Sequence, residues 1–146
     1  MPITLKGKFS VVRPAMLYGS ECWAVDKKAE QRMSVAETRM LRWMSAVTGE
    51  DRIRKESIRG SLGVASIVEK TRENMLRRFG HVIKRDEAEA VRGVMKINVE
   101  GKSEKGRPKK KWVDGKQSEM MVAGVIERDL RYRALWRCRT RVADPM

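Results

Sequence analysis

Hydrophobic residues recur at helical spacing along much of the chain, with charged residues between them. The clearest helix is predicted over residues 26–49, where apolar positions step by three or four and Leu41 widens the stripe. These positions are Met33, Ala36, Met40, Met44 and Val47. Asp26 is suited to cap the start of this helix and Gly49 to end it.

A second strong pattern follows Ser66. Ser66 and Glu69 have the spacing of a capping box, in which each side chain accepts from a backbone N–H of the first turn. Five positions then repeat at helical spacing: Ile67, Thr71, Met75, Phe79 and Val82. Gly80 inside this run costs about 1 kcal/mol relative to alanine. It either permits close packing of another residue or simply weakens the helix.

Two shorter elements are predicted from less regular patterns. A short helix from about Pro14 to Gly19 fits the preference of proline for a first helical turn, and an extended segment is the alternative. A second short helix follows Asp51 and turns two isoleucines inward. Its inward positions are Ile53 and Ile58, and the following turn contains Gly60 and Gly63.

The C-terminal part has a mixed pattern. Residues 87–112 begin with apolar positions that form one more helical turn or a short strand, and then lose periodicity. A helix is predicted over 118–130, although Gly124 weakens it. A last helix, around 129–145, turns three residues inward and is closed by Pro145. Those inward residues are Leu135, Trp136 and Val142.

These elements predict an all-α protein with several short helices, one long helix and a flexible basic loop near residues 100–112. The loop, GKSEKGRPKKKW, has almost no apolar residues. It therefore cannot bury enough surface to offset the entropy of ordering. The chain divides into a helical region at 1–92, a basic flexible linker at 93–113 and a C-terminal helical segment at 114–146.

Charge narrows the functional classes. The chain has 33 Lys and Arg against 19 Asp and Glu, a formal net charge of +14. Such an excess indicates a polyanionic partner, and nucleic acid is the best candidate. A membrane partner is disfavoured because the longest apolar run, MMVAGVI, is too short to span a bilayer. The first residues lack the apolar run of a signal peptide, so we expect an intracellular protein, nuclear or cytoplasmic.

Candidate phosphate contacts fall into three groups of basic residues. On the helix after Ser66 they are Arg72, Arg77, Arg78, Lys84 and Arg85. In the basic loop they are Lys102, Lys105, Arg107, Lys109, Lys110 and Lys111. On the last helix they are Arg133, Arg137, Arg139 and Arg141. Such contacts position a strand and do not read its sequence.

The sequence offers no recognisable set of catalytic residues. The sequence contains no Gly-rich phosphate loop, no carboxylates at metal-binding spacing and no local nucleophile–base pair. One histidine and two distant cysteines cannot form a zinc site. We expect no cofactor, no metal and no catalysis by this chain, and we expect His81, beside Phe79, to be a packing or hydrogen-bonding histidine rather than a ligand or base. A constellation that only folding assembles is left open.

Five blocks in order carry a resemblance: VRPAMLYGSECWAV, VAETRMLRWM, DRIRKESIRGSLGVASIVEKTRENMLRRFGHV, GRPKKKW and LWRCRTRVADP. Together they resemble the C-terminal region of non-LTR retrotransposon reverse transcriptases of the long-interspersed-element, RTE-like type, over residues 6–145. The chain departs from the family at Arg78, where a tryptophan is usual, and at Ser45-Ala46, where relatives tend to have Cys-Gly.

The resemblance implies part of a helical thumb, followed by a basic connector, from an RNA-directed DNA polymerase. The catalytic aspartate pair of the palm has no counterpart here, and neither has an endonuclease site. The implied partners are an RNA–DNA hybrid or duplex DNA, and the missing palm of the parent element. Residues 1–92 would then be the thumb-like region.

Two alternatives to this function stay open. Gly106-Arg107-Pro108 has the composition of a minor-groove hook, in which arginine enters a narrow A·T-rich groove. A small nuclear DNA-binding protein would use it in that way. The other alternative is an expressed relic of an element that has no biochemical function.

Overall fold

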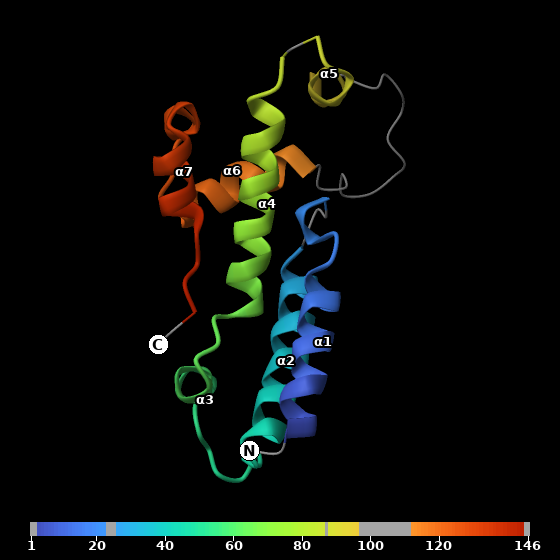
Figure 1. The fold of residues 1–146 in the computed structure, drawn as a ribbon, viewed down its shortest axis with the longest axis vertical. Coiled ribbons are helices and arrows are strands. Elements are labelled where there is room, and N and C mark those ends of the chain that lie inside the picture. The colour runs from blue at the N-terminus through green and yellow to red at the C-terminus, as the bar shows by residue number, and fades with distance from the viewer. Residues whose placement is uncertain (1–2, 23–25, 87, 97–111, 145–146) are drawn as a thin grey trace. The chain divides into compact units, whose positions relative to one another are not determined.

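The computed structural model describes residues 3–22, 26–86, 88–96 and 112–144. In these residues the regular structure consists of seven α-helices and two short 3₁₀ helices, without strands, which confirms the all-α fold class (Figure 1). The elements in chain order are α1 (Ile3–Leu17), η1 (Ser20–Cys22), α2 (Lys27–Met44), α3 (Lys55–Leu62), α4 (Ile67–Ile83), α5 (Ala90–Lys96), α6 (Trp112–Val122), η2 (Glu127–Arg131) and α7 (Arg133–Thr140). No helix among them is long and apolar enough to cross a membrane.

The chain forms two compact units. Unit 1 contains the described residues of Met1–Ser20, Val25–Glu73 and Val142–Met146. Unit 2 contains those of Glu21–Ala24 and Asn74–Arg141, so helix α4 contributes to both units. The predicted boundaries at residues 92 and 113 stay a prediction, and the basic loop falls mostly at 97–111, outside the described residues.

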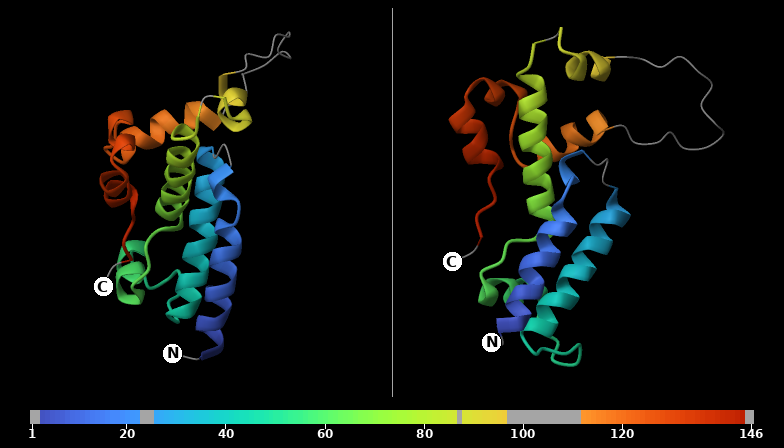
Figure 2. Two further views of the ribbon diagram at one scale, coloured as in Figure 1. Left: turned by 45° about the horizontal axis from the view of Figure 1, so that its top comes forward. Right: turned by 45° about the vertical axis from the view of Figure 1, so that its right-hand side comes forward.

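Helix α2 confirms the strongest prediction at its start and ends earlier than predicted. The Asp26 carboxylate accepts a hydrogen bond from the Ala29 N–H at 2.7 Å, which is the predicted cap. The helix stops at Met44 rather than near Gly49, because Ala46 adopts a left-handed conformation with φ of 53°. Figure 2 shows α1 and α2 side by side and antiparallel.

Helix α1 corrects the prediction around Pro14. The helix begins at Ile3 and passes through Pro14, whereas the sequence predicted a short helix starting there, or an extended segment. An internal proline removes one backbone hydrogen bond and costs about 3 kcal/mol. Two residues of the same helix make tertiary contacts that offset this cost. Phe9 packs against the apolar core of unit 1, and the Arg13 guanidinium donates to the Ala65 carbonyl.

The segment between α2 and α3 is a hydrogen-bonded loop. The Asp51 carboxylate accepts from the Thr48 backbone N–H at 2.6 Å and from the Thr48 hydroxyl at 2.9 Å. These hydrogen bonds, the backbone one first, hold the pKa of Asp51 below its ordinary value. The Asp51 side chain therefore stabilises this loop and does not begin a helix. Helix α3 starts at Lys55, later than predicted.

Helix α3 keeps one of its two predicted inward residues. Ile58 is buried at 3% exposure, but Ile53 lies before the helix and is 39% exposed. Gly60 is inside α3 and not in the turn, so only Gly63, with φ of 62°, ends the helix as predicted.

The core of unit 1 is small and contains a buried charge. Leu41, Met44 and Ile58 form its apolar cluster. Beside them the side chain of Glu37 has 0% exposure. The buried face of α2 therefore differs from the predicted methionine stripe. Its buried residues are Glu37, Leu41 and Met44, whereas the other predicted stripe positions are half-buried.

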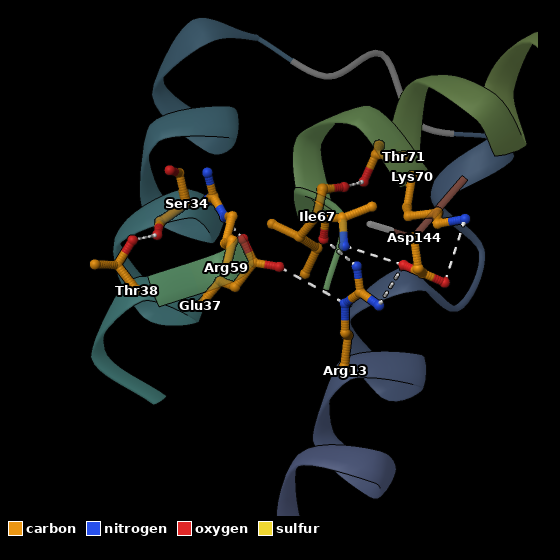
Figure 3. Close-up of polar contacts among 10 residues, drawn as sticks. Arg13, Ser34, Glu37, Thr38, Arg59, Ile67, Lys70, Thr71 and Asp144 are labelled. Atoms are coloured by element: carbon orange, nitrogen blue, oxygen red, sulfur yellow. Dashed lines mark hydrogen bonds and ion pairs between the residues drawn. The ribbon is translucent and has the colours of Figure 1, made fainter. Parts of the chain in front are cut away.

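Two arginines from neighbouring helices meet the Glu37 carboxylate (Figure 3). Arg59 Nη2 on α3 lies 2.7 Å from Glu37 Oε2, and Arg13 Nε on α1 lies 3.6 Å from Oε1. Both guanidiniums are mostly buried, with side-chain exposures of 12% and 15%. One carboxylate on α2 therefore connects the three helices of unit 1 that precede α4.

Helix α4 confirms the second strong pattern. It begins at Ile67, directly after the predicted cap Ser66. All five residues of its predicted stripe are buried: Ile67, Thr71, Met75, Phe79 and Val82. The pattern succeeded here because apolar spacing and actual burial coincide along the whole helix.

Unit 2 has a more conventional apolar core. Leu76 and Phe79 of α4 pack in one cluster with Met120, Val125, Leu130 and Trp136. The helix predicted over 118–130 is in fact α6 and η2, separated at Gly124 with φ of 63°. Residues 90–96 form α5, the helical alternative for that segment. Leu135 is 37% exposed rather than inward, and Val142 is half-buried beyond the end of α7.

Replacing Glu37 with glutamine tests its role in unit 1. The substitution removes the counter-charge of the mostly buried Arg59 and leaves Arg13 with the Asp144 carboxylate 3.9 Å away, so we expect the free energy of unfolding to fall by about 3–5 kcal/mol. Urea denaturation followed by circular dichroism measures this change. Glu56→Gln removes a carboxylate that is 66% exposed and paired with Lys55, and should change the stability by less than about 1 kcal/mol. Equal effects of the two substitutions would contradict a central role for Glu37.

Ala46→Gly tests the end of α2. Alanine in the left-handed region is strained by about 1–2 kcal/mol. Glycine removes this strain, but it loses more conformational entropy on folding, which cancels part of the gain. We therefore expect a gain in unfolding free energy of about 0.5–1 kcal/mol. The same substitution at Ala36, inside α2, should instead lose about 1 kcal/mol. A loss at both positions in thermal denaturation would show that Ala46 is not left-handed in solution.

Candidate nucleic-acid interface

Basic residues from two distant segments line one cleft in unit 2. Arg77 and Lys84 come from α4, and Arg133 and Arg137 come from α7. The cleft has a volume of about 210 Å³, and its lining in the described part of the chain includes no carboxylate. The structure thus brings together four of the predicted phosphate contacts.

Helical spacing explains each wall of the cleft. On α4, positions 77, 81 and 84 step by four and three residues, so they share one face. On α7, positions 133 and 137 are one turn apart. Helix α7 lies beside the C-terminal half of α4 (Figure 1), and the two basic rows therefore border the same hollow.

The floor of the cleft is a close contact between Gly80 and Trp136. A Cβ atom at Gly80 would lie 2.7 Å from Nε1 of the indole, closer than side chains approach. Trp136 is only 4% exposed, and its Nε1 has no hydrogen-bond partner among the described residues. Gly80 therefore permits close packing, the first of the two roles considered for it.

His81 lines the cleft between the basic residues of α4, with an exposed side chain. The sequence predicted a packing or hydrogen-bonding histidine; because His81 is exposed it does not pack in the core, and the hydrogen-bonding role stays a prediction. The signal that could have found it is the spacing of Arg77, His81 and Lys84, which recurs on one helical face. An imidazole there can donate a hydrogen bond to an anion in the cleft.

Two predicted contacts on the last helix have other partners or positions. Arg139 Nη1 lies 2.7 Å from Asp129 Oδ2, and this carboxylate also accepts from the Ile126 N–H. The pair fixes η2 against α7, so Arg139 serves the fold. Arg141 is exposed after the end of α7, and its backbone N–H donates to the Arg137 carbonyl. Neither side chain lines the cleft.

Three predicted contacts on α4 and just beyond it also lie elsewhere. Arg85 forms an exposed ion pair with Glu89, with Nη1 and Oε2 2.6 Å apart. Arg78 lines two neighbouring hollows, one of them beside the exposed, free thiol of Cys22. Arg72 lines a larger cavity in unit 1. The six predicted contacts of the basic loop lie outside the described residues.

Within the described residues, no group of three or more His, Cys, Asp or Glu side chains is placed to hold a metal ion. Comparison with known proteins gives no match. No family model, curated protein or solved structure matches the chain. The likeness to retrotransposon polymerases therefore rests on the sequence blocks alone. The candidate interface is argued only from the residues that line the cleft.

Gly80→Ala tests the floor of the cleft. The new methyl group must displace the buried indole of Trp136, so we expect the unfolding free energy to fall by about 1–3 kcal/mol. Gly93→Ala is the matched control, because Gly93 lies in α5 of the same unit with no neighbouring atom within 4 Å of its Cβ position. There the helix propensity of alanine should add up to about 1 kcal/mol. Equal shifts in a urea titration would show that the close contact is absent in solution.

Proposed function

We propose that the chain binds nucleic acid through phosphate contacts on unit 2. The observation that carries the proposal is the cleft between α4 and α7, where four basic side chains from positions about fifty residues apart border one hollow. Like charges repel, so the convergence of Lys84, Arg133 and Arg137 on a cleft without a lining carboxylate is unfavourable until an anion enters. A phosphodiester provides that anion, and a chain of formal charge +14 attracts its polymers.

The size of the cleft favours a short segment of backbone. Pockets for drug-sized ligands and cofactors occupy about 300–1,000 Å³, whereas this cleft has about 210 Å³. Guanidinium groups such as those of Arg133 and Arg137 bind phosphate oxygens in pairs, and the ammonium group of Lys84 adds a point charge. Contacts of this kind hold a strand without selecting its sequence.

The sequence blocks suggest where such binding would belong. In a reverse transcriptase of the retrotransposon type, this chain would form the helical thumb and the basic connector after the palm. It would hold an RNA–DNA hybrid or duplex DNA beside a palm supplied by another part of the element. We therefore propose a binding role without nucleotide incorporation by this chain itself.

Replacing Lys84, Arg133 and Arg137 together with glutamine tests the cleft. Each lost phosphate contact should flatten the dependence of log K on log salt concentration by about 0.9, hence by about 2 to 3 for the three. Fluorescence anisotropy with a labelled RNA–DNA hybrid and a DNA duplex measures affinity between low and moderate salt. We expect the weakening to be the same for A·T-rich and mixed sequences.

The matched control replaces Lys27, Lys28 and Arg32 with glutamine. These three residues are exposed on α2, in unit 1, and their loss removes the same net charge. An unchanged salt slope in the cleft variant, or an equal change in the control, would remove the cleft from the interface. A preference for A·T-rich duplexes that persists in the cleft variant would favour the Gly-Arg-Pro hook instead.

A further inference from the structure

The C-terminal segment after α7 is bound to the surface of unit 1. The Val142 backbone N–H donates to Glu73 Oε2 at 3.1 Å, and the Val142 carbonyl accepts from Lys70 Nζ. Two residues later, Asp144 Oδ1 accepts from the Ala65 backbone N–H at 3.0 Å. Figure 3 shows the Asp144 carboxylate pointing toward the side chains of Arg13 and Lys70.

Asp144 fits this position incompletely. Its carboxylate lies 3.9 Å from Arg13 Nη1 and 4.0 Å from Lys70 Nζ, beyond hydrogen-bonding distance. Among the described residues, the hydrogen bond that its oxygens accept comes from the backbone N–H of Ala65. Two cations and a backbone N–H thus surround a carboxylate that is too small to reach all three donors.

Asp144 belongs to a network of charged side chains in unit 1. Three cationic side chains, Arg13, Arg59 and Lys70, lie in the network. Two of its anions, Glu37 and Glu73, are buried, with side-chain exposures of 0% and 8%. Asp144 is the third anion and has 52% exposure. It is therefore the only one of the three that can be exchanged for another anion without unpacking the interior.

Space for a larger anion lies beside Asp144. A cavity of about 650 Å³ in unit 1 is lined by Asp144, Ala65 and Ser66, and its other charged lining residues are Arg59, Arg72, Glu56 and Glu69. A phosphate group is larger than a carboxylate and has more acceptor oxygens in a tetrahedral arrangement. It can accept from the Ala65 N–H, the Arg13 guanidinium and the Lys70 ammonium at once, as backbone N–H groups and basic side chains do in known phosphate sites.

We propose that Arg13, Lys70 and the Ala65 N–H form an anion site for a phosphate group, and that Asp144 occupies this site from within the chain. Phosphate then competes with the C-terminal segment for the same three donors. The site lies in unit 1 and shares no residue with the cleft of unit 2, so it does not depend on the proposed function.

Asp144→Asn in the full chain is the direct test, with inorganic phosphate as the probe. Asparagine keeps the shape of the side chain but removes the competing charge, so we expect phosphate to bind at least tenfold more tightly than to the wild-type chain. Isothermal titration calorimetry at constant ionic strength, with chloride as the reference anion, measures the affinity. Glu50→Gln removes an exposed carboxylate elsewhere in unit 1 and should leave the affinity unchanged.

A second substitution assigns the gain to this site. Lys70→Gln combined with Asp144→Asn should abolish the tighter binding. Equal phosphate affinity in the Asp144→Asn and Glu50→Gln variants would overturn the proposal, as would a gain that survives Lys70→Gln. If Asp144→Asn fails to fold, the wild-type chain still decides the matter by NMR. Phosphate must shift the Ala65 amide resonance more than chloride does, and no difference would overturn the proposal.

The same variant distinguishes two sources of the phosphate group. A short thymidine oligonucleotide that displaces inorganic phosphate from Asp144→Asn would assign the site to the nucleic-acid backbone. Phosphate binding that the oligonucleotide does not displace would assign the site to the free ion. In both cases the Ala65 amide resonance reports occupation of this site, separately from binding to the cleft of unit 2.

Discussion

The arrangement of unit 1 depends on one buried carboxylate. Glu37 is removed from water on α2, and a lone charge in that position would be prohibitively unfavourable. Arg13 on α1 and Arg59 on α3 must therefore reach it in the folded state. The apolar cluster of Leu41, Met44 and Ile58, with Phe9, Val47 and Leu62 packed against it, could be packed in several ways, because hydrophobic contacts are non-directional. We infer that the charged contact selects one of them, because any other packing leaves a buried ion unpaired.

In unit 2 the helices are held together by apolar packing rather than by a buried charged contact. Its helices meet through an apolar core, and the closest approach is made possible by the absence of a side chain at Gly80. The indole of Trp136 fills that space and brings α7 beside α4. The consequence is that two rows of basic residues border one cleft. Apolar packing must offset their repulsion in the free protein, and this is why an anion bound there should also stabilise unit 2.

Sequence patterns predicted those parts of the fold in which local spacing decides burial. Helix α4 and the capped start of α2 are such cases. Helix α1 was mispredicted because the rule for Pro14 is local, whereas contacts of Phe9 and Arg13 with distant residues sustain the helix. Glu37 escaped notice because a glutamate inside an apolar stripe normally marks its edge. The basic rows at 77–84 and 133–137 were each visible, but only the folded chain pairs them.

The two units also show why net charge alone does not locate a binding site. In unit 1 the basic side chains of the network are matched by carboxylates, down to the exposed Asp144. In unit 2, Arg139 is matched by Asp129 and Arg85 by Glu89. Each matched cation already contacts a protein carboxylate, which partly neutralises its charge before a phosphate approaches. Among the described residues, Lys84, Arg133 and Arg137 line the cleft without a carboxylate in its lining, which is why the cleft is proposed as the place where a phosphodiester gains most from their charge.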